Sequence, residues 1–184
     1  MSISEENRFV FKQRFRDPME LLITQEHTGF ALMMIALPLL ERYIRGRRNL
    51  GDISPLPDAF FEELRYLFPE ISDLEGGRTF WQAFRHGIVH QATFSLKGRG
   101  KKTFSGYLGF QDLNGQPLVI HKGIQEFYCM VDPIVFARTV LAHIEQDLGA
   151  FNLADTKHPI AMVGELPTGA ISIQIDLRRR IRPN

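Results

Sequence analysis

The segment that says most about the architecture reads Arg78-Thr-Phe-Trp-Gln-Ala-Phe-Arg-His-Gly-Ile-Val-His90. On an α-helix, which turns by about 100° per residue, its large apolar side chains fall on one stripe that can be buried. These are Phe80, Trp81, Phe84 and Ile88. The polar side chains fall on the other side, and they are Arg78, Thr79, Gln82, Arg85, His86 and His90. The pattern predicts a helix with an anchored apolar face and a polar face that carries two arginines and two histidines.

Helices are also predicted before this segment. Asp17-Pro18 is a plausible helix start, with Asp as the cap and Pro in the first turn. A long apolar segment follows from Met19 to Ile44, with Gly29 and Pro38 as possible breaks or kinks. It ends in the basic run 45–49, which is typical of a helix C-terminus. A second helix is predicted over 58–67 and a third over about 74–90.

The pattern changes after Gln91. Asn114-Gly115 is a strong hairpin signal, and alternating apolar residues around it predict an antiparallel meander of three or four strands. Asp132-Pro133 opens a fourth helix that ends at Gly149, and strict alternation over 171–177 predicts a strand. The predicted class is therefore α+β: an N-terminal helical bundle followed by a small antiparallel β-sheet and a C-terminal helix and strand.

This order of elements suggests three parts. Residues 1–16 are polar and read as an N-terminal arm, and residues 17–91 form the helical region. Residues 92–184 carry the β-meander, the helix and the C-terminal strand, which we expect to pack as part of the same domain.

The chain has 184 residues and a formal net charge of +1, which argues against a uniformly basic nucleic-acid coat protein. Sixteen of its 22 basic residues nevertheless fall in four short groups, within 8–16, 42–48, 97–102 and 178–182. Such groups fit either a phosphate-binding face or an ordinary solvated surface. The single cysteine excludes an intramolecular disulfide and a zinc site of several cysteines.

Composition also bears on location. Acidic residues stand near the N-terminus where a signal peptide would carry Lys or Arg. The longest apolar run, Phe30–Leu40, has eleven residues, whereas a membrane span needs about 20. We therefore expect a cytoplasmic protein without a membrane partner.

The spacing of Arg85, a polar residue at His86, and His90 forms an Arg-x4-His arrangement near a helix end. It resembles the signature of the HEPN (higher eukaryotes and prokaryotes nucleotide-binding) superfamily, and the helical content of residues 17–91 suits that family's bundle. His86 stands where the family more commonly has Asn. The resemblance implies a homodimer whose two motifs face each other, and a metal-independent endoribonuclease that needs no cofactor.

The residue types make such chemistry intelligible. His90 titrates near neutral pH and can exchange a proton with a ribose 2′-OH, and Arg85 can hold phosphate oxygens. Attack by the 2′-OH needs no metal. On an ideal α-helix the two residues stand about 140° apart, so a symmetric partner could complete the site. His86 is an auxiliary contact, and the predicted RNA-binding residues are Arg78, Gln82, Arg45, Arg47, Arg48, Lys101 and Lys102.

Other interpretations stay open. Arg85 could bridge to the acidic segment 52–75, leaving a non-catalytic interaction or nucleotide-binding module with a protein partner or an antitoxin. His86 and His90, four residues apart, could bind a metal ion only with a third ligand, and we predict no metal site. Cys129 is either a buried apolar residue or, with His143, a nucleophile.

Overall fold

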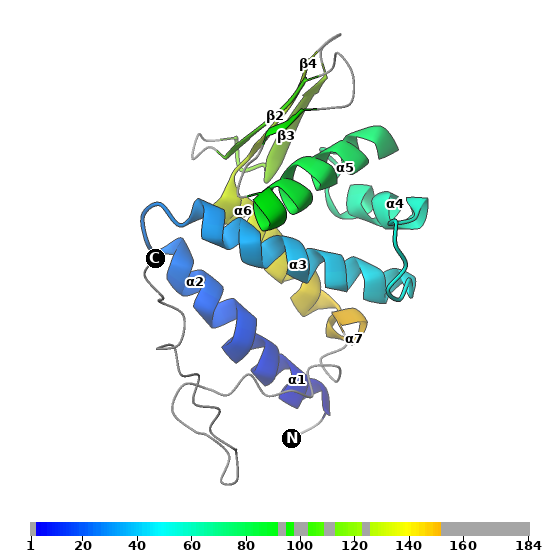
Figure 1. The fold of residues 1–184 in the computed structure, drawn as a ribbon. Coiled ribbons are helices and arrows are strands. Elements are labelled where there is room, and N and C mark those ends of the chain that lie inside the picture. The colour runs from blue at the N-terminus through cyan, green and yellow to red at the C-terminus, as the bar shows by residue number, and fades with distance from the viewer. Residues whose placement is uncertain (1–2, 92–94, 98–102, 109–112, 123–125, 152–184) are drawn as a thin grey trace, which may run out of the picture. The chain divides into compact units, whose positions relative to one another are not determined.

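The computed structural model describes residues 3–91, 95–97, 103–108, 113–122 and 126–151, all within one compact unit. Its helices are α1 (Ile3–Phe11), the π-helix η1 (Lys12–Arg16), α2 (Asp17–Ile23), α3 (Gly29–Arg48), α4 (Asp58–Leu67), α5 (Leu74–Trp81), the π-helix η2 (Gln82–Gln91), α6 (Pro133–Gln146) and α7 (Leu148–Phe151). Its strands are β1 (Ser95–Lys97), β2 (Thr103–Leu108), β3 (Leu118–Lys122) and β4 (Glu126–Val131) (Figure 1). The predicted α+β class is confirmed.

Local capping signals fix two of the helix starts. The Asp132 carboxylate accepts hydrogen bonds from the backbone N–H groups of Ile134 (2.9 Å) and Val135 (3.0 Å), with Pro133 in the first turn. The Asp73 carboxylate likewise accepts from the Gly76 N–H at 2.7 Å, which starts α5. These side chains satisfy N–H groups that have no partner within the helix.

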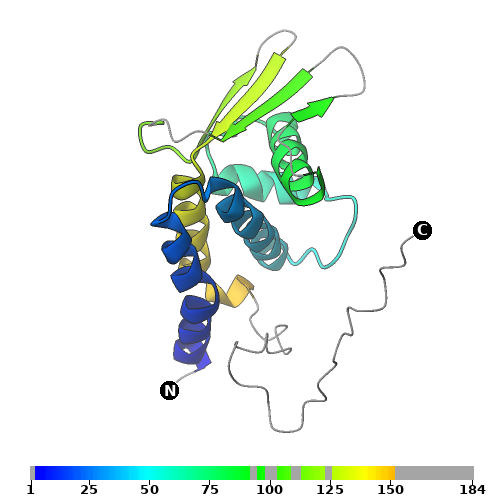
Figure 2. The same cartoon turned by 60° about the vertical axis from the view of Figure 1, so that its left-hand side comes forward.

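Helix α3 lies at the centre of the helical part, in contact with α2, α4, α6, α7 and η2 (Figure 2). The apolar segment predicted from Met19 to Ile44 is divided by a turn over residues 24–28. There Thr24 Oγ1 donates to the Leu21 carbonyl and Thr28 Oγ1 donates to the Leu22 carbonyl. Gly29 therefore begins α3, whereas Pro38 lies inside it.

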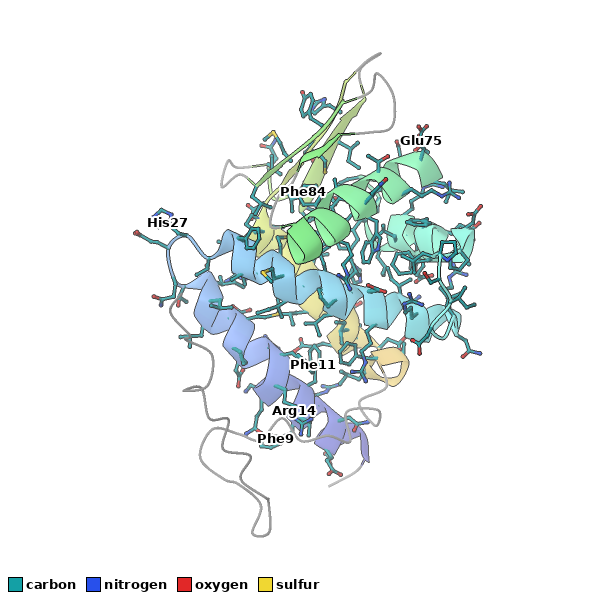
Figure 3. The ribbon with its side chains drawn as sticks, viewed as in Figure 1. Phe9, Phe11, Arg14, His27, Glu75 and Phe84 are labelled. Atoms are coloured by element: carbon teal, nitrogen blue, oxygen red, sulfur yellow. The ribbon has the colours of Figure 1, made fainter. Side chains whose placement is uncertain are left out.

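The first residues differ from the expected polar arm, because residues 3–16 are helical and run without interruption into α2. Asp17 is consequently the first residue of α2 and not its cap, and Arg16, which holds the cap position, makes no side-chain cap hydrogen bond. Phe11 is fully buried, and its ring lies 5.6 Å from that of Phe15 and 5.5 Å from that of Phe151 (Figure 3). Burial of these rings attaches the segment to the core and explains why it is ordered as helix.

The sheet has the order β1-β2-β4-β3, and it departs from a simple meander because β2 pairs with β4 in parallel. Asn114 and Gly115 form the predicted turn, with φ of 56° and 76°, but β3 pairs with β4 rather than with β2. Strand β4 buries Cys129 and Val131, which suits a central position, whereas β3 exposes His121 and takes the edge. The predicted strand 171–177 lies outside the described residues.

Candidate functional site

Arg85 lies on η2 and is held by Glu41 of α3. The Nε atom of Arg85 donates to Oε2 of Glu41 at 2.9 Å, and the two side chains are 22% and 20% exposed. The predicted apolar stripe anchors this helix: Phe80 and Phe84 are fully buried, with ring centroids 5.1 Å apart. Figure 3 shows where Phe84 lies on this helix. Arg85 thus projects from a well-packed support, as a binding site requires.

The charges around Glu41 do not balance. Its Oε1 atom also accepts a hydrogen bond from Nε of Arg45 at 3.1 Å, so one carboxylate serves two guanidinium groups. Nη1 of Arg85 is buried and has no hydrogen-bond partner within the described part of the chain. An unsatisfied buried donor costs about 1–3 kcal/mol, and more when it is charged. An anionic oxygen at the exposed part of the Arg85 guanidinium would neutralise the extra charge, and it would reach Nη1 only if neighbouring groups moved aside.

The π-helical form of η2 changes the relation between Arg85 and position 90. In a π-helix the hydrogen bonds join residue i to residue i+5, so residues five apart stack as residues four apart do in an α-helix. Positions 85 and 90 therefore lie on the same side of the helix, and the separation expected from an α-helix does not apply. The side chains of His86 and His90 lie outside the described residues.

The three arginines predicted to bind RNA at the end of α3 are engaged by other parts of the fold. Arg45 donates from Nη1 to the carbonyl oxygens of Gly51 (2.6 Å) and Ile53 (3.2 Å) and so holds the loop that follows α3. Arg47 and Arg48 both pair with Glu63, each with an N–O distance of 2.6 Å. The Glu63 side chain is only 5% exposed, so these contacts have a structural role whether or not RNA also binds there.

The other predicted contact residues have different surroundings. Arg78 pairs with Asp58, and its guanidinium lies 5.4 Å from the centre of the Phe61 ring. Gln82 is exposed. Lys101 and Lys102 lie outside the described residues.

Cys129 and His143 lie on different elements, β4 and α6. Cys129 is 1% exposed, and burial raises the pKa of its thiol well above the ordinary value. This fits the interpretation of Cys129 as a buried apolar residue, since a thiolate is the nucleophilic form. His143 Nε2 donates to the Leu67 carbonyl oxygen at 3.2 Å, and burial lowers the pKa of its imidazole. Among the described residues no group of three His, Cys, Asp or Glu is placed to hold a metal ion.

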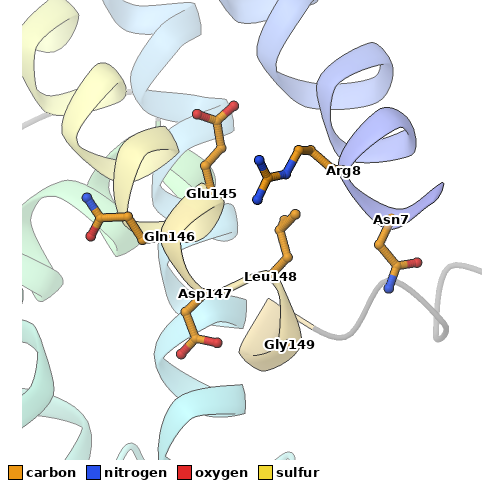
Figure 4. A pocket seen from close by; sticks show the side chains of 7 residues that line it. All are labelled: Asn7, Arg8, Glu145, Gln146, Asp147, Leu148 and Gly149. Atoms are coloured by element: carbon orange, nitrogen blue, oxygen red, sulfur yellow. The ribbon is translucent and has the colours of Figure 1, made fainter. Parts of the chain in front are cut away.

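A pocket of about 490 Å³ lies between α1 and the junction of α6 with α7 (Figure 4). Its lining is Asn7, Arg8, Glu145, Gln146, Asp147, Leu148 and Gly149. Two of its acids are already paired, Glu145 with Arg16 and Asp147 with Arg47. None of these residues belongs to the predicted site.

Glu41 is the functional candidate that sequence reasoning missed. It is the only acid between Phe30 and Ile44, and Arg45 follows it by four residues. A lone carboxylate within an apolar helix is a signal of a specific partner, because buried charges are paired in folded proteins. The partner on η2 could not be identified without the fold.

Comparison with known proteins brings no match: no family model fits the chain, and no curated protein or solved structure is significantly similar to it. The HEPN resemblance therefore rests on the motif of Arg85 and His90 and on the helical content of residues 17–91, without support from a matching protein. Over the described residues, no helix combines the length and the apolar character that crossing a membrane demands.

Proposed function

We propose that this protein is a HEPN-like RNA-binding protein and a metal-independent endoribonuclease. The observation that carries the proposal is the state of Arg85: its guanidinium shares one carboxylate with Arg45 and keeps a buried N–H without an acceptor. About a fifth of the Arg85 side chain is exposed, so an anion can contact the accessible part of the guanidinium from solvent, whereas Nη1 itself is buried. A phosphodiester supplies the charge and the acceptor oxygens that this group lacks.

The reaction assigns one role to each residue of the motif. His90 accepts the proton of the ribose 2′-OH, whose oxygen attacks the adjacent phosphorus. The P–O2′ bond forms, the P–O5′ bond breaks, and the leaving 5′-oxygen takes a proton from solvent water, while His90 then releases the proton it accepted to solvent. Arg85 stabilises the negative charge on the non-bridging oxygens as it develops. The products are a 2′,3′-cyclic phosphate and a 5′-OH, and no metal takes part. His86 is an auxiliary polar contact.

A homodimer is part of the proposal, because the resemblance implies that two motifs face each other. The π-helical backbone adds that each chain presents positions 85 and 90 on one side of the same helix. Pairing of two chains would then set two complete sites beside each other rather than assemble one site from two halves.

The second candidate is a non-catalytic interaction or nucleotide-binding module, which binds a protein partner or an antitoxin. The ion pair between Arg85 and Glu41 favours it, because a partly buried ion pair can serve structure alone. The two candidates differ in their response to salt. RNA binding through phosphates weakens steeply as salt rises, whereas an interaction surface dominated by apolar contacts does not.

RNA cleavage in excess EDTA tests the proposal. The wild type should cut single-stranded RNA, and Arg85→Ala and His90→Ala should each lower the rate by roughly 100-fold or more. Arg138→Ala and His27→Asn are matched controls, since Arg138 is 57% exposed on α6 and His27 is exposed in the turn before α3. Equal loss in a control, or cleavage that requires a metal, contradicts the proposal.

Binding of 2′-O-methyl RNA, which cannot be cleaved by this route, separates recognition from chemistry. Glu41→Gln keeps an oxygen that can accept from Arg85 but removes the competing negative charge. We expect it to tighten RNA binding roughly 2- to 10-fold at low salt, with the gain lost at high salt. Unchanged or weaker binding by a folded Glu41→Gln variant favours the interaction module.

A further inference from the structure

The face of the sheet that points away from the core carries a stacked pair of aromatic rings. His121 on β3 and Tyr128 on β4 are direct cross-strand partners. Their ring centroids are 4.6 Å apart and their planes differ by 23°. Tyr128 is 36% exposed and His121 is exposed. Cys129, the next residue of β4, is buried, so the ring pair lies on the opposite, outward side.

The strand register extends this face across β2. Tyr128 is opposite Ser105, and Met130 is opposite Tyr107 in the parallel pair. Residues paired across a sheet share a face, so position 107 lies on the same face as His121 and Tyr128. The described aromatic side chains of this face are those of His121 on the edge strand β3 and Tyr128 on the central strand β4.

The sheet region also differs in charge from the rest of the chain. Residues 92–131 contain five Lys or Arg and only two Asp or Glu, although the whole chain is nearly neutral. By the strand register, positions 97 and 126 lie on the same face as Tyr128, whereas position 122 lies on the opposite face with Cys129. A segment with net positive charge attracts a polyanion, and exposed rings provide planar surfaces on which unpaired bases stack.

We propose that this outward face binds single-stranded nucleic acid, with the His121–Tyr128 pair stacking against unpaired bases. The same ring pair could stabilise the sheet alone, and the test below distinguishes the two roles. Strands β1 and β2 contact η2, the helix that carries Arg85, so the sheet adjoins the proposed cleavage site. That link to cleavage rests on the proposed function, whereas binding at the sheet goes beyond it and needs no 2′-OH.

The test is fluorescence anisotropy of the full chain with a labelled short single-stranded DNA, which cannot be cleaved through a 2′-OH. Tyr128→Ser should weaken binding roughly 5- to 100-fold, as expected when one stacked base is lost. Tyr128→Phe keeps the ring and should bind within about 2-fold of the wild type. Tyr66→Ser is the matched control, because Tyr66 is 71% exposed on α4 and should not contribute. A DNA duplex of the same sequence should bind more weakly than the single strand.

Thermal melting checks that each variant is folded. Binding of the same DNA by His121→Ala is also measured, and it tests the role of the ring pair if Tyr128→Ser is not folded. The proposal is overturned if the wild type does not bind single-stranded DNA, or if the folded Tyr128 and His121 variants bind as the wild type does. It is also overturned if Tyr66→Ser weakens binding as much as Tyr128→Ser. DNA cannot be cleaved through a 2′-OH, so a failure of the ribonuclease proposal does not change the expected DNA binding. A failure of DNA binding at the sheet likewise does not change the expected RNA cleavage.

Discussion

At the scale of single residues, two carboxylates hold four arginines, three on α3 and one on η2. Glu41 holds Arg45 and Arg85, and Glu63 holds Arg47 and Arg48. The two differ in burial, because the Glu63 side chain is 5% exposed and that of Glu41 is 20% exposed. We assign the more accessible group, Glu41 with Arg45 and Arg85, to ligand binding. The more buried carboxylate, Glu63, has the larger role in stability.

Replacement of Glu63 tests that division. Glu63→Gln removes the charge that compensates Arg47 and Arg48, and we expect a loss of about 1–3 kcal/mol in the free energy of unfolding. Glu62→Gln is the control. Glu62 is the exposed neighbour of Glu63 on the same helix, and its replacement should change the free energy of unfolding by less than about 0.5 kcal/mol. Urea denaturation of both variants measures the difference. Equal stability of the two would show that Glu63 is not a structural anchor.

His143 gives stability a pH dependence. Burial lowers its pKa below the ordinary value of 6.5, so below that pH the unfolded chain takes up a proton that the folded chain does not. Stability then falls as pH falls from about 7 to 5, because protonation favours the unfolded state. His143→Gln can still donate to the Leu67 carbonyl and should show a smaller fall over this range. Identical pH profiles for the variant and the wild type would count against this assignment.

At the scale of elements, the close approach of α3 and α7 depends on Gly46. A Cβ atom built at this position overlaps the backbone carbonyl oxygen of Ala150, and backbone cannot move aside as a side chain can. Ala favours a helix over Gly by only about 1 kcal/mol, so the overlap should outweigh that gain. The contact joins α3 to the element that carries Phe151 and so to the aromatic cluster with Phe11.

Gly46→Ala should therefore destabilise the protein by about 1–3 kcal/mol, as overpacking does. Gly77→Ala is the matched control, because the added Cβ would lie 3.6 Å from Ile71 and Phe61, an ordinary contact distance. It should be neutral or stabilise by up to about 1 kcal/mol. Thermal melting of both variants checks the prediction, and a stabilising Gly46→Ala would contradict the described packing of α3 and α7.

The π-helix η2 leads to a prediction about how the site is composed. Positions 85 and 90 share one side of a single helix, so both must be intact in the same chain. An equal mixture of the Arg85→Ala and His90→Ala variants, allowed to exchange subunits, should recover no cleavage. Restored cleavage would instead show that each site takes one residue from each chain, as α-helical spacing suggested.

At the scale of the whole molecule, the features that could be predicted from the sequence are those that local patterns determine. The amphipathic helix over 58–67 and the start of α6 at Asp132-Pro133 follow from periodicity and capping. The parallel pairing of β2 with β4, the helical residues 3–16 and the ion pair from Glu41 to Arg85 were not predicted. Each of these three features depends on contacts between segments that are far apart in the sequence. The π-helical form of residues 82–91 was not predicted either, because α-helical spacing was assumed for them.

The central claim is that Arg85 binds a phosphate at which RNA is cut, and the chemical ends of the products test it most directly. Purified wild type, Arg85→Ala and Arg138→Ala are incubated with RNA in excess EDTA, and the termini are identified by mass spectrometry. We predict 2′,3′-cyclic phosphate and 5′-OH ends with the wild type and Arg138→Ala, and intact RNA with a folded Arg85→Ala variant. Intact RNA with the folded wild type, or the same ends from Arg85→Ala, would contradict the claim.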